Sequence, residues 1–243
     1  MKKNIKYILA LAVAPMMLAS CDDMLNKHPQ ATLSPETFFT NESEMMSFSN
    51  SFYTIFPSTG LYNENCDNYI GIDLISEIRD GRVIPGSGSG WSFTDLRKFN
   101  TLLDYSGNCK DEKVRNRYVG LARFFRAYFY FEKVKRFGDV PWYDTQLGSK
   151  DDRLYKARDT REFVMGKMLE DIDFAIANLP ETRSVYTVTK WTALALKSRF
   201  CLFEGTYRKY HEINEYEHDW KYWLELSAAA SAEFMNKSGY TLH

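Results

Sequence analysis

The side chains that most often carry out catalysis are few and poorly spaced in this chain of 243 residues. Its four histidines, at positions 28, 211, 218 and 243, form neither a His-Glu-x-x-His pair nor another convincing metal-binding spacing. No Gly-x-Ser-x-Gly elbow supplies a serine nucleophile. Asp171 and Asp173 are two residues apart in an expected helix, so they face different directions and cannot flank one bond. We therefore predict no catalytic residues, no metal and no cofactor, and we expect that the protein is not an enzyme.

Cys21 is the residue whose surroundings predict a definite chemistry. Lysines at positions 2, 3 and 6 precede an apolar run from Tyr7 to Ala19, which is typical of a secretory signal peptide and shorter than the roughly 20 residues a membrane span needs. The run ends in Leu18-Ala19-Ser20-Cys21, which resembles the lipobox of bacterial lipoproteins, where the cysteine sulfur takes a diacylglycerol. Several acyl chains on one cysteine anchor a protein durably. We expect residues 1–20 to be removed and Cys21 to carry a lipid; the alternative is an ordinary cleavage site that happens to precede a cysteine.

The other three cysteines, at positions 66, 109 and 201, have long and irregular separations. An exported protein can form disulfides, but the sequence does not choose a pair among Cys66, Cys109 and Cys201. Cys201 lies in an apolar helical stretch and is predicted to be a small buried hydrophobic residue.

The composition excludes several classes of protein. With 44% hydrophobic and 26% charged residues, the chain is neither disordered nor a polytopic membrane protein. Lysine and arginine number 31 against 32 acidic residues, and removal of residues 1–20 leaves 28 against 32. A nucleic-acid binder needs a basic surplus to neutralise phosphates, so we expect no nucleic-acid partner.

The chain begins rich in loops and becomes helical. Residues 21–34 are predicted to be an extended tether, and residues 35–243 one helical domain. Ser34 is expected to cap its first helix, with Pro35 at the first helical position. From Pro57 the helical pattern breaks, ending in a glycine- and serine-rich loop before Trp91.

Four long helices are predicted after this loop. They cover about 111–137, 160–179, 189–207 and 219–236, where apolar residues recur at three- and four-residue steps. Small alanines and serines alternate with large aromatic residues on these faces, which lets neighbouring helices approach closely. Successive antiparallel pairs of this kind predict an all-α, tetratricopeptide-like helical repeat, an α-α superhelix, with irregular loop insertions.

Three stretches together resemble the SusD/RagB family of outer-membrane lipoproteins from Bacteroidetes. The first is the arginine- and aromatic-rich segment from Tyr118 to Pro141, which ends in Phe-Gly-Asp-Val-Pro. The second runs from Arg158 to Pro180, and the third from Thr189 to Gly205. Trp91, Arg97 and Asn100 fit the preceding helix, and the lipobox fits the start. Family chains are about twice this length, so residues 35–243 resemble the N-terminal part of a member, truncated at the C-terminal end.

This resemblance implies a surface lipoprotein that binds a nutrient, most often a glycan, and delivers it to a SusC-like TonB-dependent transporter. The protein would be held on the outer membrane through its lipid and exposed at the cell surface, and Asp22-Asp23 would match the acidic signal for that export. Which glycan or other nutrient it takes is not specified by the sequence. Two alternatives from other classes stay open: an anchored helical-repeat scaffold that binds only proteins, and a glycan-processing enzyme.

Sugar recognition requires flat aromatic faces and planar hydrogen-bonding side chains held on loops over a rigid scaffold. Our predicted ligand-binding residues are Arg79, Asp80, Arg82 and Trp91, which lie before and at the start of the first core helix. For the arginine pair the alternative is a local salt bridge, and for Trp91 simple packing at the helix start. Trp142 and Tyr143, just after Pro141, form a second candidate as exposed aromatic residues. Arg123, Arg126 and Arg136 are expected to be structural, because aromatic residues surround them at helical spacing.

Overall fold

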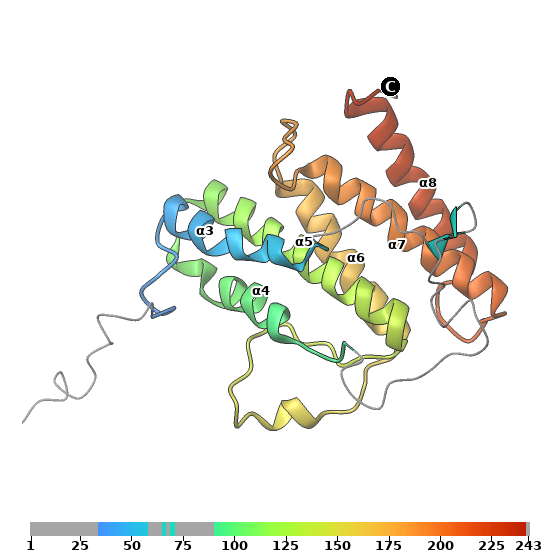
Figure 1. Ribbon diagram of the computed structural model, residues 1–243, viewed down its shortest axis with the longest axis horizontal. Coiled ribbons are helices and arrows are strands. Elements are labelled where there is room, and N and C mark those ends of the chain that lie inside the picture. The colour runs from blue at the N-terminus through green and yellow to red at the C-terminus, as the bar shows by residue number, and fades with distance from the viewer. Residues whose placement is uncertain (1–33, 58–64, 67–68, 71–89, 242–243) are drawn as a thin grey trace, which may run out of the picture. The chain divides into compact units, whose positions relative to one another are not determined.

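The computed structural model describes residues 34–57, 65–66, 69–70 and 90–241. Within these ranges the regular secondary structure is helical apart from two short strands (Figure 1). In chain order its elements are α3 (Glu42–Ser49), the 3-10 helix η1 (Asn50–Ile55), β1 (Asn65–Cys66), β2 (Tyr69–Ile70), α4 (Thr94–Tyr105), η2 (Ser106–Asn108), α5 (Glu112–Phe137), η3 (Asp152–Tyr155), α6 (Arg161–Asn178), α7 (Lys190–Tyr210) and α8 (Trp220–Lys237). The two short strands pair in antiparallel fashion.

The first helix begins later than the sequence predicts. The chain divides into two units after Phe38, and in the first unit Ser34 opens a turn in which its carbonyl accepts from the Thr37 N–H at 3.1 Å. The second unit begins with Phe39, whose φ of 68° no α-helix tolerates. Asn41 then caps α3 by accepting from the Glu44 N–H at 3.1 Å. The prediction of Ser34 as N-cap is therefore wrong.

The four long predicted helices are confirmed. Their N-caps are the residues at which the predicted ranges begin: Asp111, Thr160 and Asp219 each accept a backbone N–H in the first turn of α5, α6 and α8. Thr189 forms a capping box at the start of α7. Helix α5 ends at Gly138, whose φ of 69° favours glycine.

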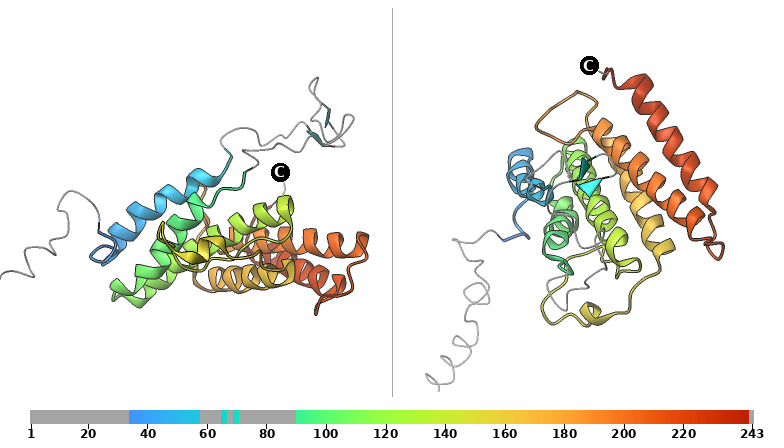
Figure 2. Two further views of the ribbon diagram at one scale, coloured as in Figure 1. Left: turned by 90° about the horizontal axis from the view of Figure 1, so that it is seen from below. Right: turned by 45° about the vertical axis from the view of Figure 1, so that its right-hand side comes forward.

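Helix α5 is central because neighbours cover it on several sides. It packs against α3, α4, α6 and α7, and in Figures 1 and 2 the helices α5 to α8 lie side by side in chain order. Phe124 and Phe131 lie about two turns apart on one face of α5, Phe125 lies on the adjacent face, and all three are buried. The Phe125 ring contacts the rings of Phe52 and Phe99, with a distance of 5.7 Å between centroids in each pair. Full burial of such a side chain contributes about 1.5–3 kcal/mol, so aromatic packing is a main source of stability.

Small residues allow α7 and α8 to approach closely. A Cβ added at Gly205 would meet the Leu224 side chain at 2.7 Å, and the Ser198 and Ser231 hydroxyls lie 2.6 Å apart. Cys201 is fully buried in α7, as predicted, and burial raises the pKa of its thiol to about 12. Cys109 is also buried, and both are free thiols.

Candidate functional site

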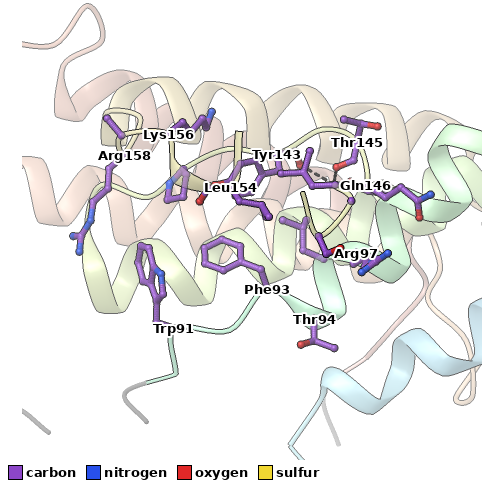
Figure 3. A pocket seen from close by; sticks show the side chains of 17 residues that line it. Trp91, Phe93, Thr94, Arg97, Tyr143, Thr145, Gln146, Leu154, Lys156 and Arg158 are labelled. Carbon is purple, nitrogen blue, oxygen red and sulfur yellow. Dashed lines mark hydrogen bonds between the residues drawn. The ribbon is translucent and has the colours of Figure 1, made fainter. Parts of the chain in front are cut away.

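A pocket of about 660 Å³ opens between the N-terminal end of α4 and the segment 141–158 that connects α5 to α6 (Figure 3). One wall comes from residues at and before the first turns of α4, among them Trp91, Phe93 and Arg97. The opposite wall comes from the connecting segment, which includes Tyr143 and Leu154. Pockets for small ligands typically have volumes of roughly 300–1,000 Å³, and the volume of this pocket lies within that range.

Aromatic rings form the floor and one end of the pocket. Trp91 is 43% exposed and leans edge-on against Phe137 and Phe93, with ring centroids 4.8 and 5.3 Å away. Phe93 also meets Tyr143 edge-on at 5.8 Å. Lys133 on α5 fixes the chain just before Trp91 by donating to the Gly90 carbonyl at 2.5 Å. The exposed indole is thus held by half-buried aromatic rings.

Three basic side chains contribute to the lining. The Arg158 guanidinium lies over the Trp91 ring, 4.9 Å from its centroid. The Lys156 ammonium pairs with the Asp159 carboxylate at 2.6 Å. Arg97 is exposed on α4, and Figure 3 shows Arg97 and Arg158 at opposite ends of the pocket.

The connecting segment is held in place by α4 and α5. The Asn100 amide of α4 donates to the carbonyls of Tyr143 and Thr145 at 2.9 and 3.0 Å. The Tyr130 hydroxyl of α5 accepts from the Tyr143 N–H at 2.7 Å and donates to the Pro141 carbonyl at 3.2 Å. These bonds satisfy backbone groups that a loop packed on helices would otherwise leave unpaired. The pocket wall is therefore preorganised.

Arg126 links this wall to α6. Its guanidinium donates to both carboxylate oxygens of Asp171, and its Nη1 donates to the Asn100 side-chain oxygen and the Asp144 carbonyl at 3.1 Å each. Both side chains of the ion pair are buried. The expectation that Arg126 is structural is confirmed, because it orients the amide that holds Tyr143.

Burial shifts the pKa of Tyr143 in the pocket and of Lys133 on α5, which holds the chain before Trp91. Burial, helped by the Asp159 and Asp151 carboxylates, raises the pKa of the Tyr143 phenol, which stays neutral near pH 7. Burial lowers the pKa of Lys133, against the pull of Asp95. The neutral Tyr143 hydroxyl donates to the Leu154 carbonyl at 3.4 Å and can still accept a hydrogen bond from a ligand.

Some of the predicted site residues line the pocket, and others lie outside the described part of the chain. Trp91 lines the pocket and is exposed, whereas Cys21, Arg79, Asp80 and Arg82 lie outside the described residues. Tyr143 also lines the pocket.

The prediction that Trp142 is exposed is wrong. It is 6% exposed, stacks on Tyr130 at 4.2 Å, and receives the Arg126 guanidinium over its ring at 5.1 Å. Residues 141–143 follow the bridge residue Val140 and are neither helical nor in a turn, and consecutive side chains here lie on opposite sides, so that Trp142 enters the core while Tyr143 lines the pocket.

Sequence reasoning missed Phe93, Leu154 and Arg158 as pocket residues. The signal that could have found them is the length of the connection between the two helices α5 and α6, because long ordered connections often carry function. Within the described ranges, no group of three or more His, Cys, Asp or Glu is placed to hold a metal ion. No helix in this part of the chain combines the length and apolarity required to cross a bilayer.

Comparison with known proteins gives a consistent result. A SusD-like family model, described as starch-binding and associating with the outer membrane, matches residues 92–202. SusD-like protein P38 of Formosa agariphila is 25% identical over 232 residues, which cover 88% of this chain and 44% of that protein. The chain thus spans less than half the length of this curated relative.

Solved structures agree on the fold. A SusD-like protein from Bacteroides fragilis superposes with a TM-score of 0.64 at 24% identity, covering 89% of this chain and 42% of that one. A laminarin-binding SusD-like protein gives a TM-score of 0.50 at 21% identity, covering 62% and 31%. The predicted all-α, tetratricopeptide-like fold is confirmed.

Proposed function

Because this chain is a member of the SusD/RagB family, we propose that it binds a glycan in the pocket between Trp91 and Tyr143. The observation that carries the proposal is a partly exposed indole held on a rigid aromatic framework, with polar side chains facing it across the pocket. Sugars bind such surfaces through their apolar ring faces while polar groups take the hydroxyls. One structural neighbour is a laminarin-binding protein, which supports the same ligand class.

The test is direct binding of purified protein to a panel of oligosaccharides by isothermal titration calorimetry. We expect saturable binding to at least one member, and loss of that binding in the Trp91→Ala variant. Failure of the folded protein to bind any member, together with stable co-purification of a protein partner, would favour the scaffold alternative.

We propose further that the bound glycan leaves unchanged. Among the described residues that line the pocket, none is an aspartate, glutamate or histidine, so they provide no acid and base for glycoside hydrolysis. New reducing ends appearing in a mixture of protein and bound glycan would contradict this.

In the cell, the proposed role is delivery of the glycan to a SusC-like TonB-dependent transporter at the outer-membrane surface, with Cys21 as the lipid anchor. Cys21→Ala should release the protein from membranes into the soluble fraction, since a thioether-linked lipid then cannot form. Persistent membrane association would contradict the anchor. Cross-linking in intact cells should recover the transporter with the native protein.

A further inference from the structure

The lining of the Trp91 pocket carries charge of only one sign. Among the described lining residues Arg97, Lys156 and Arg158 are basic and none is acidic. A neighbouring cavity of about 560 Å³, on the other side of Thr145, is lined by both signs, including Asp104, Asp144, Arg123 and Lys167. The chain as a whole is almost neutral, with 31 basic and 32 acidic residues. The cationic lining is therefore a local property of this pocket.

Two of the three cations are uncompensated within the described part of the chain. Lys156 is paired with Asp159 at 2.6 Å. Arg97 and Arg158 form no ion pair with any described residue, and Arg158 instead lies over the Trp91 ring. An arginine that has no carboxylate of its own, set beside an aromatic surface, is suited to bind an oxyanion from a ligand.

We infer that the glycan taken by this pocket is anionic, bearing uronate carboxylates or sulfate esters that pair with Arg158 and Arg97. The inference rests on the proposed function and narrows its substrate class. A sugar bound against Trp91 lies next to the Arg158 guanidinium, whose planar donors fit a carboxylate or sulfate in bidentate fashion. Arg97, at the other end of the pocket, meets a second anionic group further along the oligosaccharide (Figure 3).

The first experiment compares matched ligands by calorimetry. Uronic-acid oligosaccharides are titrated beside their carboxyl-reduced counterparts, and sulfated oligosaccharides beside their desulfated counterparts, with neutral glucans as a third set. We expect the charged member of at least one pair to bind about tenfold more tightly at low salt, because a charge-assisted hydrogen bond contributes of that order. Which pair shows the difference identifies the anion. Added salt should lower the affinity for the charged ligand only, since salt screens the attraction between exposed charges.

The second experiment removes the charges one at a time. Arg158→Gln and Arg97→Gln should each lower affinity for the anionic ligand by about tenfold and lower affinity for its neutral counterpart by much less, because glutamine can still bond a hydroxyl but cannot pair with an anion. Arg153→Gln is the matched control, because Arg153 is an exposed arginine of the same segment, pairs with Asp151 and does not line the pocket. Both pocket arginines are exposed, so the variants should fold, which circular dichroism checks.

Three outcomes would overturn the inference. Equal affinity for charged and neutral members of every pair refutes it and leaves glycan binding standing. An equal loss in the Arg153→Gln control shows general charge attraction and refutes it as well. Failure to bind any glycan, charged or neutral, refutes the proposed function and this inference together.

Discussion

The guanidinium of Arg126 donates to both carboxylate oxygens of Asp171, from Nε at 2.6 Å and from Nη2 at 2.8 Å. The two side chains are 7% and 3% exposed, so α5 and α6 meet through a bidentate pair shielded from water. Burial works against the charge on Asp171 and raises its pKa, whereas the pairing with Arg126 opposes that rise. The same guanidinium positions Asn100, which holds the pocket wall, and a contact deep in the helical stack therefore determines the shape of the site.

Asp171→Ala should lower the free energy of unfolding by about 3–5 kcal/mol, because it leaves a buried guanidinium without its counterion. Urea denaturation monitored by circular dichroism measures this. The control is Asp173→Ala on the same helix, where an exposed carboxylate pairs with Lys197 and about 1 kcal/mol or less is expected. An equal loss of stability in the two variants would mean that the buried ion pair contributes no more than the exposed one.

Gly205→Ala should destabilise the protein by about 1–3 kcal/mol through overpacking. The new Cβ would lie 2.7 Å from the Leu224 side chain and 3.0 Å from the Trp220 carbonyl, and backbone cannot easily move away. Gly166→Ala is the control, since nothing lies within 4 Å of its added Cβ on α6. That change should stabilise the helix by about 0.5–1 kcal/mol. Thermal unfolding of both variants gives the comparison, and a stabilising Gly205→Ala would contradict the close packing of α7 on α8.

The exposed Trp91 and the buried Trp142 should respond oppositely to substitution by alanine. Trp142→Ala should cost about 3–5 kcal/mol of stability, because it empties a buried site stacked on Tyr130. Trp91→Ala should change stability by about 1 kcal/mol or less and should lower glycan affinity about tenfold or more. Denaturation and calorimetry on the same samples separate the two effects. A large stability loss at Trp91 with unchanged binding would reduce its role to packing.

Cys201 should resist alkylation in the folded protein. Its pKa of about 12 lies above that of an exposed thiol, so at mildly alkaline pH the folded protein keeps the proton that the unfolded chain releases. Because the pKa is raised on folding, the free energy of unfolding falls as pH rises. The contribution of Cys201 to stability is complete below the unfolded pKa of about 8.5 and is lost as pH rises toward the folded value. Iodoacetamide labelling read by peptide mass spectrometry should modify Cys201 only after denaturation in urea. Rapid labelling of the native protein would contradict its burial.

The helices were predictable because their signals are local. Asp111, Thr160, Thr189 and Asp219 each precede an apolar pattern at helical spacing, and all four are the observed caps. The first helix was placed wrongly at Ser34 because its start depends on the positive φ of Phe39, which no sequence pattern for a bulky residue indicates. Trp142 was placed wrongly because its partner Tyr130 belongs to the preceding helix, on the far side of a turn.

The sequence by itself determined the helical repeat, the family likeness and the lipid-anchor prediction, since caps, periodicity and motifs are read from neighbouring residues. The tertiary structure alone decided which side chains share the pocket. Trp91 and Arg158 are 67 positions apart and meet only because α5 holds the start of α4 and the connecting segment on the same side. Such contacts depend on how helices pack, and packing depends on the sum of many weak distant interactions that no local pattern encodes.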